Sequence, residues 1–290
     1  MKIRLTLGQF LVEGGEPQRN LDRAERLVAR AAKAGSDVIV LPETLDFGWT
    51  HPSALEEALP VPGPYSDSLC RMARENSIYV CAGLTEKTPA GNFNTGLLIN
   101  RNGGLICTHR KINLLAVELP FYRVGGALSV VDTDGGVGGL NVCAVNYRDG
   151  LAIGHTLGRM GARVILSPSS WTTDFSLDEG QDPYADKWLG PFFILAKCYD
   201  LYVVSCTSVG YIVGGPYEGK KMIGRSLVVG PDGVRCSGPL NEFASDNVEG
   251  EIDILPAPAV GTGIGQRLRE LGYQLDDAQW PRFKARHFRN

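Results

Sequence analysis

Three apolar segments of this chain each run into a side chain that can do chemistry, and this arrangement constrains the fold most. Residues 137–143 end in Cys143, residues 38–41 lead to Glu43, and residues 105–109 are followed closely by Lys111. Short apolar runs bounded by polar or glycine-containing sequence are typical of buried strands. If these strands are neighbours, a single sheet edge carries a thiol, a carboxylate and an ammonium group.

The rest of the chain alternates strands and helices, which predicts an α/β fold. The helix after Asn20 is expected to use that residue as its N-cap and Gly35 as its C-terminal glycine. Helices are predicted at residues 21–34, 66–76, 151–160 and 184–199. Further strands are predicted at residues 1–7, 78–82, 95–100, 129–132, 164–167, 202–205, 225–230 and 248–254. The turn Asn102-Gly103-Gly104 predicts a hairpin, so part of the sheet is antiparallel.

Residues 1–254 are predicted to form one domain, because no shift in composition marks a boundary. With 290 residues, of which 43% are hydrophobic, the chain has ample material for a core. Residues 255–290 begin with helix-breaking residues and continue with charged and aromatic sequence. We therefore expect this tail to be an arm that takes part in self-association, giving a homodimer or a larger homo-oligomer.

Composition excludes several classes of partner. The net charge is −3 and the chain has no run of Lys and Arg, so nucleic acid is not expected as a partner. No apolar segment reaches transmembrane length, so no membrane is expected and cytoplasmic location is the default. Seven cysteines favour reduced, buried thiols over a disulfide framework. The four histidines show no metal-ligand spacing, and the GxG fragments lack a dinucleotide fingerprint, so neither a metal nor another cofactor is expected.

The three reactive side chains together suit nucleophilic catalysis. A thiol with a pKa of about 8.5 is mostly protonated at neutral pH, so Cys143 needs a base and a nearby cation to present a thiolate. Glu43 is the candidate base and Lys111 the candidate cation. Lys111 and the backbone N–H of Ala144 are candidates to hold an oxyanion, at about 3 kcal/mol per donor. Glu43 can then pass its proton to a leaving amine and later activate water against a thioester.

Ordinary structural roles compete with these assignments. A cysteine in an apolar strand is usually a packing residue, because free Cys is among the most buried residue types. Cys107 is the rival thiol, but it lies inside its predicted strand. Trp171 either packs in the core or lines the substrate pocket. Arg148 and Arg225 are either surface charges or ligands of a substrate carboxylate.

The motifs that carry these residues resemble those of the nitrilase superfamily, the carbon-nitrogen hydrolases. They are Leu41-Pro42-Glu43, Arg110-Lys111-Ile112-Asn113-Leu114 and Gly139-Leu140-Asn141-Val142-Cys143, in the family's order. The resemblance implies an α-β-β-α sandwich, a Glu-Lys-Cys triad and assembly as a dimer or larger oligomer. Glu118 would then orient Lys111 or share the proton transfer.

The stretch after the cysteine departs from the family pattern. Members usually carry an acid or amide two residues after the nucleophile, where this chain has Val145. Cys143 also lies two residues further upstream of Gly161-Ala162 than the nucleophilic cysteine does in most members of the family. An alignment without insertion would place Val145 at the nucleophile position and imply an inactive protein. We favour an insertion absorbed at residues 147–150, because it preserves the lead-in to Cys143.

Two classes of function follow. The first is a cysteine-dependent amidohydrolase that cleaves a non-peptide C–N bond in a small linear amide or N-carbamoyl compound through a thioester. Nitrile hydrolysis is a variant, although the Trp-Glu pair typical after a nitrilase cysteine is absent. The second is a catalytically silent homologue that binds a ligand, as the altered sequence after Cys143 would allow.

Overall fold

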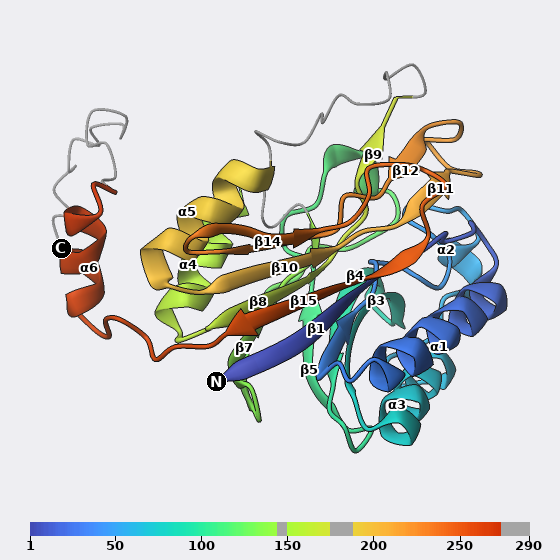
Figure 1. Cartoon of the computed structure of the whole chain (residues 1–290). Coiled ribbons are helices and arrows are strands. Elements are labelled where there is room, and N and C mark those ends of the chain that lie inside the picture. Colours follow the sequence, from blue (N-terminus) through green and yellow to red (C-terminus); the bar gives the residue numbers. More distant parts are fainter. Residues whose placement is uncertain (144–149, 175–187, 274–290) are drawn as a thin grey trace, which may run out of the picture.

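Two six-stranded sheets pack face to face, and helices cover their outer faces (Figure 1). This computed structural model describes residues 1–143, 150–174 and 188–273. Helices α1 and α3 cover one sheet, and α4 and α5 cover the other. The predicted α-β-β-α sandwich of the carbon-nitrogen hydrolase type is confirmed.

The first sheet has the strand order β15-β1-β2-β3-β4-β5. Its strands are β1 (Lys2–Gln9), β2 (Val38–Val40), β3 (Tyr79–Thr88), β4 (Gly91–Ile99), β5 (Leu105–Arg110) and β15 (Asp246–Asp253). β1, β2 and β3 are parallel, whereas β3-β4-β5 are antiparallel, so the predicted hairpin at residues 102–104 is confirmed. β3 and β4 are longer than predicted because they continue as one hairpin to the turn before Gly91.

The second sheet has the order β14-β13-β10-β8-β7-β6. Its strands are β6 (Val130–Thr133), β7 (Gly136–Leu140), β8 (Val164–Pro168), β10 (Tyr202–Cys206), β13 (Leu227–Gly230) and β14 (Gly233–Ser237). The sequence did not predict the additional sheet β11-β12-β9, because its strands are only two or three residues long. They are β9 (Thr172–Thr173), β11 (Val209–Tyr211) and β12 (Lys221–Ile223).

Each long helix buries one apolar stripe against its sheet. The helices are α1 (Pro17–Lys33), α2 (Ala54–Glu57), α3 (Pro64–Asn76), α4 (Leu151–Arg159), α5 (Gly190–Tyr199), α6 (Gly263–Glu270) and the 3₁₀ turn η1 (Ala116–Glu118). The predicted N-cap at Asn20 is wrong, because α1 begins at Pro17, whose fixed φ suits the first helical turn. The Asn20 amide instead donates to the carbonyls of Glu13 and Asp46, which ties α1 to the loop after β2. Residues 184–187 of the last predicted helix lie outside the described residues.

Part of the tail packs on the domain. Ile264 and Leu268 of α6 are buried in the same apolar cluster as Phe192 of α5, and Arg267 forms an ion pair with Asp200 at 2.8 Å. Residues 274–290 are not described, so a role of the tail in self-association stays a prediction. Among the described helices, none has both the length and the apolar character needed to cross a membrane. All seven cysteines are free thiols, as predicted.

Candidate active site

The predicted site residues meet because two sheets face each other. The sequence left open whether Glu43, Lys111 and Cys143 follow neighbouring strands of one sheet, and they do not. β2 and β5 belong to the first sheet and are separated by β3 and β4, whereas Cys143 follows β7 of the second sheet. Apolar periodicity shows that a strand is buried but not which sheet it joins.

Lys111 lies at the centre of a buried charge cluster. Its Nζ is 2.8 Å from Glu118 Oε1 and 3.3 Å from Glu43 Oε2, and none of the three side chains is exposed. The Asn94 side-chain amide donates to Glu43 Oε2 at 3.0 Å and lies 3.5 Å from Glu118 Oε1. Buried charges are stable only when they are paired and hydrogen-bonded, and this cluster meets that requirement.

Glu118 is held in place by two further hydrogen bonds. Trp49 Nε1 donates to Glu118 Oε1 at 2.8 Å, and the backbone N–H of Leu115 donates to Oε2 at 2.8 Å. The sequence assigned no role to Trp49 or Asn94. The signal for Asn94 was a buried polar position in the middle of β4, a feature that it shares with Asn92 and Thr95.

Cys143 lies in a sharp turn three residues after the end of β7. Its φ is 45°, in the left-handed region that residues other than glycine adopt at a cost of about 1–3 kcal/mol. The side chain is buried, and its thiol donates to the carbonyl of Ser170 at 3.5 Å. Backbone strain of this kind clusters at functional sites, so the turn supports a functional role for Cys143.

The pKa values of Lys111, Glu43 and Cys143 are shifted from their usual ranges. Burial lowers the pKa of Lys111, but Glu118 and Glu43 outweigh burial and raise it, so Lys111 stays charged. Burial raises the pKa of Glu43, and Lys111 partly opposes this shift. Burial also raises the pKa of Cys143, and the Glu43 charge adds to the increase while Lys111 opposes it.

These directions correct the prediction of a thiolate. Burial and the Glu43 charge raise the pKa of Cys143 by more than Lys111, which is shared by two carboxylates, lowers it. The resting Cys143 is therefore a thiol. The Cys143 thiol donates a hydrogen bond to the Ser170 carbonyl, and Glu43 Oε1 has no hydrogen-bond partner among the described residues. Oε1 is therefore available to accept a proton.

The other predicted residues have mixed outcomes. Trp171 is buried and stacks on Trp188, with 4.9 Å between ring centroids and 15° between planes, in the same apolar cluster as Cys143.

Cys107 lies inside β5 in the apolar layer between the sheets, away from that cluster. Arg225 is partly exposed between β12 and β13. Ala144, Val145 and Arg148 lie outside the described residues.

No cluster of three or more His, Cys, Asp or Glu side chains in the described ranges has the arrangement of a metal site. The functional side chains of the described site are instead a thiol, two carboxylates, an ammonium group, an amide and an indole. This set is suited to moving protons and stabilising a negative charge on oxygen.

The comparison with known families places the chain among the hydrolases of C–N bonds. The model of the carbon-nitrogen hydrolase family matches residues 9–255, and the chain belongs to this family. It is 30% identical over 221 residues to a nitrilase from Pyrococcus abyssi. The aligned segment covers 74% of this chain and 77% of that protein. It is also 32% identical over 154 residues to the mouse omega-amidase NIT2, covering 49% of this chain and about half (54%) of that protein.

Solved structures share the fold at lower identity. An amidase from Nesterenkonia sp. superposes with a TM-score of 0.75 at 19% identity, covering 93% of this chain and 95% of that chain. The carbon-nitrogen hydrolase from Helicobacter pylori G27 gives a TM-score of 0.78 at 17% identity, covering 94% of each chain.

Proposed function

We propose that this protein is a cysteine-dependent amidohydrolase that cleaves a small linear amide or N-carbamoyl compound through a thioester. The observation that carries the proposal is the buried Lys111, which is clamped by Glu43 and Glu118 beside the strained turn at Cys143. Membership of the carbon-nitrogen hydrolase family and the similarity to omega-amidases support an amide substrate.

In the first half of the reaction, Glu43 acts as general base. Cys143 Sγ attacks the amide carbon as its proton moves to Glu43, a C–S bond forms, and the carbonyl π electrons move to oxygen. Lys111 Nζ, and the Ala144 N–H inferred from the sequence, stabilise the oxyanion. The intermediate then collapses, the C–N bond breaks, and the amine or ammonia takes the proton from Glu43.

In the second half, water replaces the amine. Glu43, again a carboxylate, removes a proton from water as the water oxygen attacks the thioester carbon. The C–S bond breaks, the proton returns to sulfur, and the carboxylic acid leaves. A base with a raised pKa suits this cycle, because Glu43 must both accept and return a proton.

Glu118 is a positioning residue in this scheme. Glu118 lies 2.8 Å from Lys111 Nζ, whereas Glu43 lies 3.3 Å from the same atom. Glu118 also accepts hydrogen bonds from Trp49 and from the backbone N–H of Leu115. Glu118 therefore carries most of the counter-charge of Lys111. Glu43 Oε1 then stays available for the proton.

Nitrile hydrolysis remains the second candidate reaction. The Pyrococcus abyssi relative is named a nitrilase, and the same thiol can attack a nitrile carbon. The third candidate is the silent ligand-binding homologue, in which the sequence around Val145 would have removed catalysis.

One screen separates these candidates. Purified protein is incubated with short aliphatic amides, N-carbamoyl amino acids and short nitriles, and ammonia release is measured. The Cys143→Ala variant is the matched control. Release from amides or carbamoyl compounds, lost in the variant, is the expected result. Ammonia release from nitriles alone would support nitrile hydrolysis. If the folded protein releases no ammonia from any of the three classes, the result would support a catalytically silent homologue.

We also propose that the chain self-associates as a homodimer or larger homo-oligomer through the helices beside Cys143 and the tail 255–290. Exposed Phe193 and Ile194 on α5 are consistent with a covered helical face. Size-exclusion chromatography with light scattering tests this proposal, and a monomer at all accessible concentrations would contradict it.

A further inference from the structure

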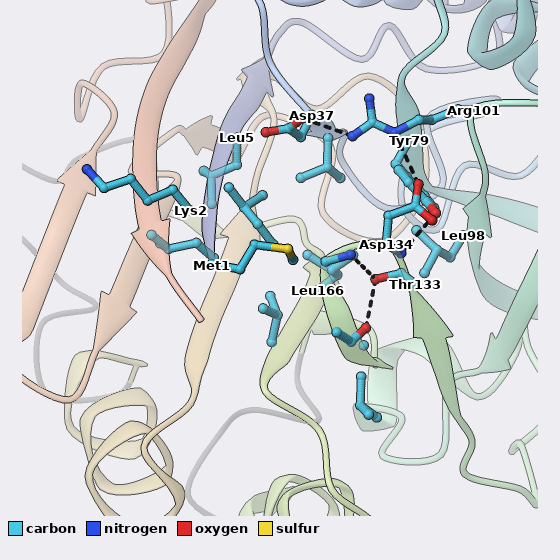
Figure 2. Close-up of a pocket in the computed structure, with 18 residues that line it drawn as sticks. Met1, Lys2, Leu5, Asp37, Tyr79, Leu98, Arg101, Thr133, Asp134 and Leu166 are labelled. Carbon is cyan, nitrogen blue, oxygen red and sulfur yellow. Dashed lines mark hydrogen bonds and ion pairs between the residues drawn. The ribbon is translucent and has the colours of Figure 1, made fainter. Parts of the chain in front are cut away.

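A cavity of about 260 Å³ lies between the two sheets (Figure 2). Both sheets contribute its apolar walls. The main wall residues are Leu5, Val38, Leu98 and Ile252 from the first sheet and Val164 and Leu166 from the second.

This cavity lies at the far end of the sandwich from the catalytic cluster. Val38 begins β2 and Val164 begins β8, whereas Glu43 and Ser170 follow the ends of these strands. At about 3.3 Å per residue, Val38 and Glu43 are separated by up to about 16 Å along the chain. A ligand in this cavity therefore does not occupy the position of the amide substrate.

A missing side chain at Gly138 helps to create the cavity. Gly138 is inside β7, where it pairs with Val131 and Val164, and glycine weakens a strand at such a position. A Cβ at Gly138 would be 3.8 Å from the nearest described atom, so close packing does not require glycine there. At the next residue, Gly139, a Cβ would lie only 3.1 Å from Ala162. Close packing thus explains the glycine at 139, whereas position 138 could hold a Cβ at ordinary contact distances.

The charged groups at the mouth are paired with one another. Arg101 forms ion pairs with Asp37 at 2.9 Å and Asp134 at 3.6 Å, and its guanidinium lies 5.3 Å from the centre of the Tyr79 ring (Figure 2). The Thr133 hydroxyl donates to the Gly136 carbonyl.

The charged groups on the opposite side of the mouth also form ion pairs. Lys2 pairs with Glu251 at 2.8 Å, and the terminal ammonium of Met1 pairs with Asp253 at 3.0 Å. A charged ligand would have to break one of these pairs or lose its own solvation, and both are costly. An uncharged ligand can contact the apolar walls without breaking any of these pairs.

We propose that this cavity is a second small-molecule site that takes a compact, uncharged, apolar ligand such as a substituted aromatic ring. Dry apolar cavities of about 150 Å³ hold benzene, so this volume suits a ligand of about ten heavy atoms. The site does not depend on the proposed amidohydrolase activity, since it uses none of the catalytic residues.

Ethylbenzene is the probe, and methyl NMR of the full chain labelled at Ile, Leu and Val is the measurement. Ethylbenzene should shift the methyl signals of Val38, Leu98, Val164 and Leu166 saturably, and those of Val142 beside the catalytic cysteine should not move. Phenylacetate, a charged analogue of similar size, should cause no shift. Absence of saturable shifts at these four residues, or equal binding of phenylacetate, would overturn the proposal.

Two variants locate the site. Gly138→Leu fills the cavity and should abolish the shifts, whereas Gly126→Leu, at an exposed glycine whose Cβ would meet no atom within 4 Å, should leave them unchanged. If Gly138→Leu does not fold, Gly138→Ala should fold, because its Cβ contacts are of ordinary length, and should weaken binding. Undiminished binding by whichever of the two variants folds would contradict the assignment.

Discussion

Lys111 and Glu118 form an ion pair with 2.8 Å between Nζ and Oε1, and neither side chain is exposed to solvent. Glu43 approaches the same ammonium group at 3.3 Å. One buried cation is thus shared by two buried carboxylates. With both carboxylates ionised, the cluster carries a net negative charge even before Cys143 loses a proton. The stability of the protein and the catalysis that we propose both depend on that balance.

Lys111→Ala should strongly destabilise the fold. The substitution leaves Glu43 and Glu118 buried without a cation, which typically costs about 3–5 kcal/mol of unfolding free energy. The loss should be smaller at pH 5 than at pH 8, because protonation of a carboxylate relieves the repulsion. Urea denaturation of both proteins measures the difference.

The matched control is Lys2→Ala, which removes a lysine from the exposed pair with Glu251. Solvent screens that pair, so its denaturation midpoint should not change measurably. Equal effects of the two substitutions would show that the Lys111 cluster is not a charge-balanced unit.

Glu118→Gln should impair turnover more than substrate affinity. It keeps the size of the side chain but removes the nearest counter-charge of Lys111, so the ammonium group shifts relative to the developing oxyanion. Misplacement of a catalytic group by about 1 Å can cost about 100-fold, and we expect a loss of that order in kcat with little change in KM. Steady-state kinetics on the amide identified by the screen measures both constants.

Glu86→Gln is the control for that experiment. Glu86 is also a buried carboxylate, but it pairs with Arg110 and Thr95. Its substitution should leave kcat within a few-fold of the parent value. A Glu118→Gln enzyme that is as active as Glu86→Gln would remove Glu118 from the account.

Asp46 should make stability depend on pH in a defined direction. Burial raises the pKa of this carboxyl to about 7, although hydrogen bonds such as that from the Thr85 N–H oppose the shift. Because the folded pKa lies above the unfolded one, the stabilisation is fully present below about pH 4 and is lost as the pH rises through 7. The shift corresponds to about 4 kcal/mol.

The Asp46→Asn variant tests this pH dependence of stability, because the Asn side chain resembles the protonated acid and does not ionise. The unfolding free energy of the parent should fall relative to that of the variant between pH 4 and pH 8. Comparing the two proteins cancels the opposite contribution of His109 and His155, whose pKa values are lowered to about 4. Parallel pH profiles would contradict the assignment of Asp46.

Local pattern predicted most strands and helices and the residues around which the site forms. Glu43, Lys111 and Glu118 do converge, and the fold is the sandwich that the motifs of residues 41–43, 110–114 and 139–143 implied. The ends of β2 and β5 were predictable to within one residue, because polar residues interrupt the apolar runs there.

The spatial partners were not predictable in the same way. Strands β2 and β7 are both buried and apolar, so their sequences do not reveal that they lie in different sheets. The hydrogen bond from Trp49 to Glu118 joins residues 69 positions apart, and no local pattern encodes it. The direction of the Cys143 pKa shift depends on how two carboxylates share Lys111, which only the three-dimensional arrangement shows.

The central claim is that Cys143 carries the acyl group, and trapping that group tests it most directly. The protein is mixed with an amide that it hydrolyses, and the reaction is quenched in acid within milliseconds. The protein is then digested, and its peptides are mapped by mass spectrometry. The account predicts the mass of the acyl group on the Cys143 peptide, released by hydroxylamine and absent from the inactive Cys143→Ala variant. Acylation of another cysteine such as Cys107, or continued turnover by Cys143→Ala, would contradict it.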